Sequence, residues 1–174
     1  MIRIALVGAA RAASVWGNPL LRIEPKGWLS WSFRVLDARG HALTEIQQAW
    51  VRERGTFSID GTRYTVRRTS AWKGTFQLEQ PEGVLAEATK PSLFRRAFDV
   101  VTPRGHLRVE ATSVFGRTFE VYRDEAPVGS IRPAAFLSRS AEADLPDDLP
   151  EPIRVFLIFL VLLLWKRAAN AAAS

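Results

Sequence analysis

Residue types that carry covalent or metal chemistry are scarce in this sequence. It contains no cysteine and only two histidines, His41 and His106, which fall in separate predicted hairpins. A thiolate nucleophile, a structural zinc site and a disulfide framework are therefore excluded, and no glycine-rich phosphate loop is present. The sequence predicts a non-catalytic protein with no cofactor and no metal site.

Paired carboxylates are the one catalytic arrangement that stays open. Glu110 and Glu120 are expected on neighbouring strands, and two acids about 5 to 9 Å apart suit a hydrolase. Cross-strand pairing with Arg108 or Arg117 accounts for these acids equally well. A hydrolase is therefore an alternative that no sequence feature demands.

Basic residues suggest an anionic partner more strongly. Adjacent antiparallel strands can gather such side chains onto one patch, and the guanidinium group fits phosphate. The formal net charge is +6, and the stretch 142–151 holds acids but no base, so the rest of the chain is more basic still. Ordinary solvated surface charge is the alternative. The candidate anion-binding residues are Arg67, Arg68, Lys73, Arg95, Arg96, Arg104 and Arg108.

The residues from about 20 to 131 form short runs of β-branched and aromatic residues separated by turn signals. The clearest is the hairpin in which Asp60 and Gly61 join two alternating runs. Similar turns predict eleven strands in a meandering antiparallel sheet, which closes on itself or splits into a sandwich. The predicted strands are 20–24, 31–36, 42–47, 56–59, 63–69, 75–80, 84–89, 94–101, 107–112, 118–123 and 127–131.

The chain then changes character. Residues 141–150 are acidic and contain proline, which predicts a linker. A helix is expected over 151–169, with a proline in its first turn and Lys166 and Arg167 near its end.

This helix decides the predicted architecture, because every residue from Val155 to Trp165 is apolar. Such a helix needs apolar surroundings on all sides. Eleven residues rise only about 16 Å, whereas a bilayer core of about 30 Å needs about twenty. A hydropathy scan would still mark the segment as a membrane span. A barrel of eleven or twelve strands has a hollow centre that a helix can fill, so we predict a mainly β fold: a closed antiparallel barrel of about twelve strands around a central C-terminal helix.

Two segments carry a resemblance to a known family. Residues 33–43, Phe-Arg-Val-Leu-Asp-Ala-Arg-Gly-His-Ala-Leu, and residues 149–160, Leu-Pro-Glu-Pro-Ile-Arg-Val-Phe-Leu-Ile-Phe-Leu, together with the run of hairpins between them, resemble the LURP-one-related proteins. These share a fold with phospholipid scramblases and the tubby C-terminal domain. The resemblance spans about 18–167 and implies a twelve-stranded barrel around a hydrophobic helix. It does not imply an activity.

The same resemblance points to particular ligands. Tubby domains bind phosphoinositides through basic residues and scramblases act on phospholipid, although no binding motif matches here position by position. Scramblases also carry a calcium-binding acidic segment ahead of the terminal helix. Prolines 146 and 150 stiffen this segment, and helix N-terminal acids are the simpler explanation. The acids in the corresponding place are Glu142, Asp144, Asp147 and Asp148.

The sequence therefore predicts one tubby-like barrel domain over 16–170, preceded by an arm or misassigned start over 1–15 and followed by a tail over 171–174. We expect a cytoplasmic monomer, peripheral to a membrane, that binds anionic phospholipid or a protein partner. Nucleic acid is not favoured, because aromatics such as Trp50, Trp72 and Phe76 are expected mainly on the apolar face. The alternative is a tail-anchored, scramblase-like protein with 155–165 inserted in the bilayer.

Overall fold

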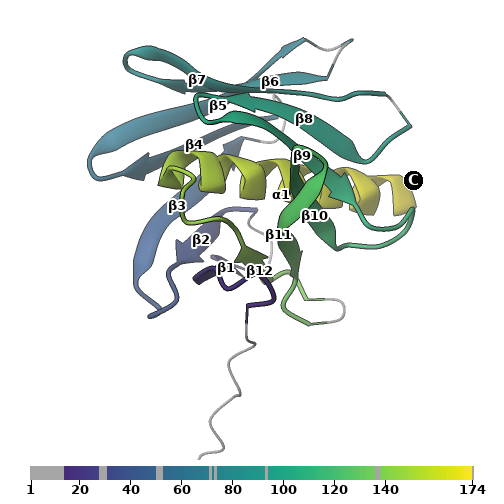
Figure 1. Cartoon of the computed structure of the whole chain (residues 1–174), viewed down its shortest axis with the longest axis horizontal. Helices are drawn as coiled ribbons and strands as arrows, with labels where there is room; N and C mark the ends of the chain where they lie inside the picture. Colours follow the sequence, from purple (N-terminus) through teal and green to yellow (C-terminus); the bar gives the residue numbers. More distant parts are fainter. Residues whose placement is uncertain are drawn as a thin grey trace, which may run out of the picture.

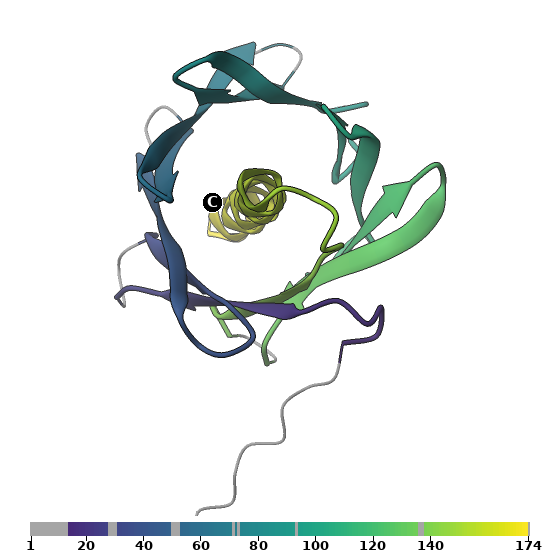
Figure 2. The ribbon, with the colours of Figure 1, turned by 60° about the vertical axis from the view of Figure 1, so that its left-hand side comes forward.

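The computed structural model describes residues 14–27, 31–49, 53–70, 72, 74–92, 94–135 and 138–173. Twelve antiparallel strands form a closed barrel in which sequence neighbours are spatial neighbours and β1 pairs with both β2 and β12. A single helix, α1 (Glu151–Ala172), runs through the middle of the barrel, as Figure 2 shows. The predicted fold class is confirmed.

The strands agree with the predicted runs, with ends shifted by a few residues. They are β1 (Leu20–Pro25), β2 (Phe33–Leu36), β3 (Ala42–Ala49), β4 (Arg54–Ile59), β5 (Thr62–Ser70), β6 (Thr75–Gln80), β7 (Gly83–Thr89), β8 (Ala97–Thr102), β9 (Gly105–Ala111), β10 (Phe119–Arg123), β11 (Ala126–Pro133) and β12 (Ala141–Asp144).

One predicted element was wrong. The first four residues of the supposed linker 141–150 form β12, which closes the barrel between β1 and β11. Ala141 and Ala143 face the core and are fully buried, while Glu142 points outward to Arg132. The strand has only two small apolar side chains, which alternate with two acids, and four residues are too short a run to stand out as a strand. The helix also continues three residues beyond its predicted end.

The interior of the barrel is filled by α1. All residues from Val155 to Trp165 are buried, and they pack against inward side chains from every part of the sheet. Alternation places Phe57, Val66 and Leu78 inside the barrel and their sequence neighbours outside. By length and composition alone α1 could also cross a membrane, but in this structure its apolar residues lie inside the protein.

The helix packs tightly against the sheet at Gly55 in β4. A Cβ atom at this position would lie 2.4 Å from Cε2 of Phe159, far inside van der Waals contact. Glycine is therefore required here for space, and the ring of Phe159 fills the room that a side chain would occupy.

We expect Gly55→Ala to lower the free energy of unfolding by about 1 to 3 kcal/mol, because overpacking forces a side chain or the strand to move. Denaturant titration measures this loss. Ser58→Ala, on the outer face of the same strand, is the matched control and should be nearly neutral. If the clash is the cause, Phe159→Leu combined with Gly55→Ala will cost less than the sum of the two single changes. Additive losses would contradict this explanation.

Candidate functional site

The meander sorts the connections onto two rims of the barrel. Connections that follow odd-numbered strands share one rim with the C-terminal end of α1, and those that follow even-numbered strands share the other with its start (Figure 1). We call the first the basic rim and the second the acidic rim, from the residues given next.

The basic rim gathers cations. Within the described residues of its connections and of α1 from Trp165 onward, Glu53 is the single acid. The cations there are Lys26, Lys90, Arg95, Arg96, Arg117, Arg139, Lys166 and Arg167. A surface with this charge balance attracts polyanions.

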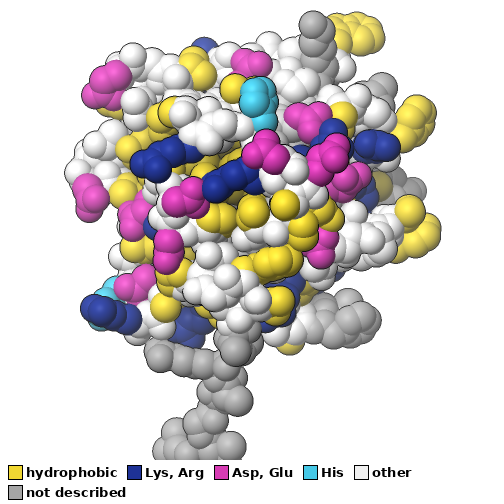
Figure 3. Space-filling model, viewed as in Figure 1, with side chains coloured by type: hydrophobic (Ala, Val, Ile, Leu, Met, Phe, Trp, Pro, Cys, Tyr) yellow, Lys and Arg dark blue, Asp and Glu magenta, His cyan; other side chains and the backbone are white. Residues whose placement is uncertain are grey.

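Exposed apolar side chains lie on the same rim. The exposed fractions are 97% for Phe94, 95% for Phe115, 93% for Trp72 and 75% for Val114. Figure 3 shows hydrophobic side chains protruding along the right-hand edge, the side on which Figure 1 places the end of α1. Trp72 is an exception to the expectation that the aromatics lie mainly on the apolar face, because it lies in the β5–β6 turn rather than on a strand, whereas Phe76 is buried. Aromatic side chains among cations are typical of surfaces that contact the headgroup region of a membrane.

The opposite rim has the reverse charge. Its connections include two exposed arginines, Arg39 and Arg104, among a larger number of acids. The acids are Asp37, Asp60, Glu82, Asp124, Glu125, Asp147, Asp148 and the first helical residue, Glu151. The molecule is thus electrostatically polarised along the helix axis, and only one end suits an anionic surface.

Glu53 fastens the end of α1 to the barrel. Its carboxylate accepts hydrogen bonds from Arg167 at 2.8 Å and from Arg68 at 2.7 Å. Burial raises the pKa of Glu53, but the hydrogen bonds and charges of Arg167 and Arg68 outweigh burial and hold the pKa below its ordinary value. The ion cluster therefore needs the ionised form of Glu53.

Replacing Glu53 by glutamine should destabilise the protein near neutral pH by about 1 to 2 kcal/mol, because two half-buried arginines lose a charged partner. A depressed folded pKa gives stability that is present above the unfolded value of about 4.3 and is lost as the pH falls through the folded value. In urea titrations the difference between the two proteins should therefore shrink as the pH falls below about 4.3 and vanish once Glu53 is protonated in the folded protein. Asp99→Asn is the control. It removes the carboxylate from the Asp99–Arg108 ion pair, which is more exposed than the Glu53 cluster, and should cost less than about 1 kcal/mol. A difference that does not change with pH would contradict the role of the charge.

The predicted basic residues do not form one patch. Arg95 and Arg96 lie on the basic rim, whereas Arg104 lies on the acidic rim at the far end of β8. Arg67 and Arg108 point outward from the barrel wall and pair with Glu79 and Asp99. Arg68 joins the Glu53 cluster. Lys73 lies outside the described residues.

The acids of the segment that the resemblance linked to calcium form ion pairs and hydrogen bonds with other segments of the chain. Glu142, Asp147 and Asp148 pair with Arg132, Arg154 and Arg123, each with a different arginine. Asp144 is buried and accepts hydrogen bonds from the Ser14 hydroxyl, the Val15 and Trp16 amides and the Asn18 side chain. In the described part of the chain no three acids or histidines are grouped so that they could hold a metal ion.

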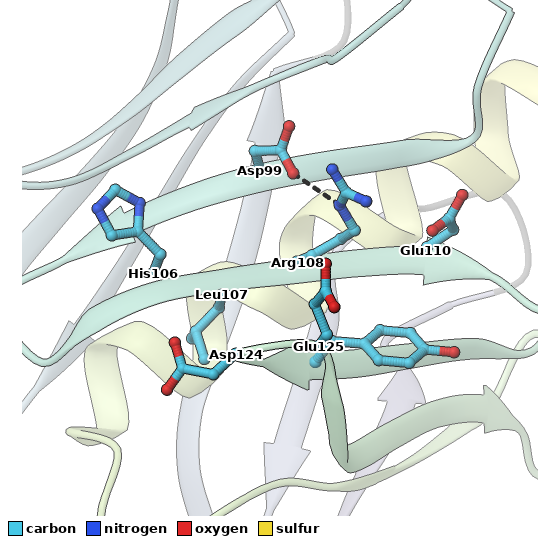
Figure 4. Close-up of a pocket in the computed structure, with 8 residues that line it drawn as sticks. Asp99, His106, Leu107, Arg108, Glu110, Asp124 and Glu125 are labelled. Atoms are coloured by element: carbon cyan, nitrogen blue, oxygen red, sulfur yellow. Dashed lines mark hydrogen bonds and ion pairs between the residues drawn. The ribbon is translucent and has the colours of Figure 1, made fainter.

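Glu110, one of the two acids considered for hydrolysis, lines a groove of about 530 Å³ on the outer face of β8, β9 and β10. Glu110 and Glu120 are direct cross-strand partners, and Glu120 accepts a hydrogen bond from the Tyr122 hydroxyl. This bond raises the pKa of Tyr122 to about 12. Figure 4 shows Asp99 and Arg108 joined across the groove and His106 apart from them. The groove is thus partly occupied by its own ion pair, that of Asp99 and Arg108.

A second pocket, of about 680 Å³, opens on the basic rim beside the last turns of α1. Its charged lining consists of three arginines from three different connections, and its other lining residues are aromatic, valine or alanine. Arg117 lies 4.4 Å above the Trp165 ring, Arg139 lies 4.9 Å above the Trp31 ring, and Arg96 donates to the carbonyls of Val114 and Gly116. The described residues that line it are Trp31, Phe33, Arg96, Val114, Phe115, Arg117, Arg139, Trp165, Ala168, Ala169 and Ala172.

Two of these arginines are charged groups with no countercharge. In the part of the chain that the structure describes, neither Arg96 nor Arg117 forms an ion pair with a carboxylate. Burial lowers the pKa of both guanidinium groups. An anion that entered the pocket would restore the balance of charge.

Comparison with known proteins adds information about the fold. No family model matches the chain, and no curated protein sequence matches it. The fold is shared with a plant protein. A crystal structure of a protein from Arabidopsis thaliana is similar over 86% of this chain and 91% of that chain, with a TM-score of 0.57 and 16% sequence identity. At this identity the likeness extends to the barrel and its helix and not to a ligand or an activity.

Proposed function

We propose that this protein is a non-catalytic, LURP-one-related barrel that binds anionic phospholipid at the surface of a membrane. The basic rim is the contact surface. The observation that supports this proposal is the gathering, on one rim only, of cations with a single acid and of nearly fully exposed aromatic side chains.

The two kinds of side chain act through different forces. Each lysine or arginine near an anionic leaflet contributes about 1 kcal/mol, and this contribution falls off within a screening length of about 8 Å at physiological salt. Phe94, Phe115 and Trp72 would insert into the headgroup region and add binding that salt does not screen. The acidic rim, at the other end of the helix, would be repelled by the membrane, so the barrel axis would stand roughly perpendicular to the membrane surface.

Vesicle co-sedimentation tests the proposal. The bound fraction should rise with the content of anionic lipid, fall as salt is added, and be near zero on neutral vesicles. Binding that ignores both lipid charge and salt would overturn the electrostatic mechanism. Absence of binding to any vesicle would favour a protein partner for the same rim.

The tail-anchored alternative makes a different demand on α1. Insertion of 155–165 in a bilayer would require the helix to leave a barrel in which each of these side chains is buried. Each buried leucine or phenylalanine contributes about 1.5 to 3 kcal/mol, and the emptied sheet would expose its own apolar face. We therefore propose a peripheral, cytoplasmic protein whose helix stays inside.

A further inference from the structure

We infer that the pocket at the centre of the basic rim binds the head group of one lipid that carries a compact phosphate monoester, the phosphatidic acid class. This inference deepens the proposed function, since the pocket opens on the surface that would face the membrane. It goes further than general attraction to negative charge, because it predicts that one anionic lipid is preferred to others.

The charge of the pocket argues for a doubly charged ligand. Arg96, Arg117 and Arg139 line it, and none of the described lining residues carries a carboxylate. A phosphate monoester carries about −1.5 to −2 charges at pH 7 and three strong acceptor oxygens, which suits several forked donors at once. A phosphodiester head group carries a single charge on its phosphate and has fewer oxygens to offer.

The walls of the pocket argue against a larger head group. Apart from the three arginines, its side chains are those of Trp31, Phe33, Val114, Phe115, Trp165 and three alanines. A sugar or polyol head group would bury hydroxyl groups against these walls without partners, which disfavours its binding. An acylglycerol directly below the phosphate would instead place apolar atoms there.

The aromatic rings hold the arginines in place for this task. Arg117 and Arg139 lie over the Trp165 and Trp31 rings, and the Trp165 indole donates to the Arg117 carbonyl at 2.9 Å. The guanidinium planes are therefore oriented before a ligand arrives, and less side-chain freedom is lost on binding.

Vesicles of equal surface charge separate this inference from the proposed function. Vesicles with phosphatidic acid should bind the protein about tenfold more tightly than vesicles with phosphatidylserine at matched charge. Arg96→Gln and Arg117→Gln should remove this preference, so that the affinities for the two kinds of vesicle become about equal. Arg95→Gln is the matched control, because Arg95 neighbours Arg96 but lies outside the pocket; it should weaken binding to both vesicles equally and leave the preference unchanged.

Two further measurements distinguish loss of the pocket from misfolding of a variant. Ala169→Trp fills the pocket from an exposed helix position and removes no charge, so it should abolish the preference while the melting temperature stays unchanged. Titration calorimetry with dihexanoyl phosphatidic acid, in the absence of vesicles, should show binding that inorganic phosphate does not reproduce.

Equal affinity of the wild-type protein for both vesicles would overturn the pocket and leave the proposed function standing. Binding of inorganic phosphate as tight as that of the short-chain lipid would also overturn it, because the apolar walls would then contribute nothing. Failure to bind either vesicle would overturn the proposed function itself, and binding of the soluble lipid alone would then assign the pocket a role away from membranes.

Discussion

Deletion of residues 151–174 is expected to leave a chain that does not fold. The barrel would lose the side chains that fill its interior, and its inward-facing residues would line an empty, solvent-filled space. The loss of a few buried leucine or phenylalanine side chains, at about 1.5 to 3 kcal/mol each, equals the whole stability of a typical domain, about 5 to 15 kcal/mol. Circular dichroism and gel filtration should show an unfolded, aggregating product.

A point substitution gives the same test within the full-length chain. Leu160→Asp places a charge in the centre of the core, where the residue is fully buried, and should abolish cooperative thermal unfolding. Ala171→Asp lies on the exposed end of the same helix and should change the melting temperature by no more than a few degrees. A soluble, cooperatively folding protein after the deletion would show that the helix is an anchor and not the core.

Charge reversal at Arg95 should lower the affinity for anionic vesicles by about 10- to 30-fold, because reversing one charge near the surface changes the electrostatic free energy by about 2 kcal/mol. The same substitution at Arg104 is the matched control. Both arginines are exposed and lie near opposite ends of β8, and both were candidates from sequence, but Arg104 belongs to the acidic rim. Arg104→Glu should leave vesicle affinity within about twofold of the wild type. Equal losses would show that net charge, and not the rim, controls binding.

The apolar component of rim binding is tested separately. Combined Trp72→Ala and Phe115→Ala should weaken binding about tenfold at every salt concentration, since insertion of aromatic side chains is not screened. Val84→Ala combined with Val101→Ala removes exposed apolar side chains from the barrel wall instead and should have no effect. A salt-dependent loss in the aromatic variant would contradict insertion.

The fold could be predicted because its two strongest signals agree. The run of alternating strands is wide enough to close into a barrel with a hollow centre, and the helix without a polar face needs apolar surroundings on all sides. Each signal therefore predicts the other. The missing element, β12, has the sequence Ala-Glu-Ala-Asp, and its strand character comes from pairing with β1 and β11 on both sides. Strand formation of this kind depends on tertiary partners and leaves little local pattern.

The candidate site was predicted less well, for a topological reason. The basic residues predicted to form one patch, such as Arg67, Arg95 and Arg104, come from successive hairpins, and successive turns of a meander lie at opposite ends of the barrel. Sorting the turns by odd and even strands would have brought together Arg95, Arg96, Arg117 and Arg139 with the end of the helix. The pairing of Arg67 and Arg108 with acids on adjacent strands depends on strand register, and a shift of one residue would change which outward side chains lie opposite each other.

The most direct measurement uses the absence of cysteine from the chain. A single cysteine at Ser113 on the basic rim, or at Glu82 on the acidic rim, can be labelled with an environment-sensitive dye without competing thiols. On anionic vesicles the dye at position 113 should shift to the blue and become shielded from an aqueous quencher, while the dye at position 82 should not change. A shift at position 82, or equal shifts at both positions, would contradict the claim that the basic rim faces the membrane.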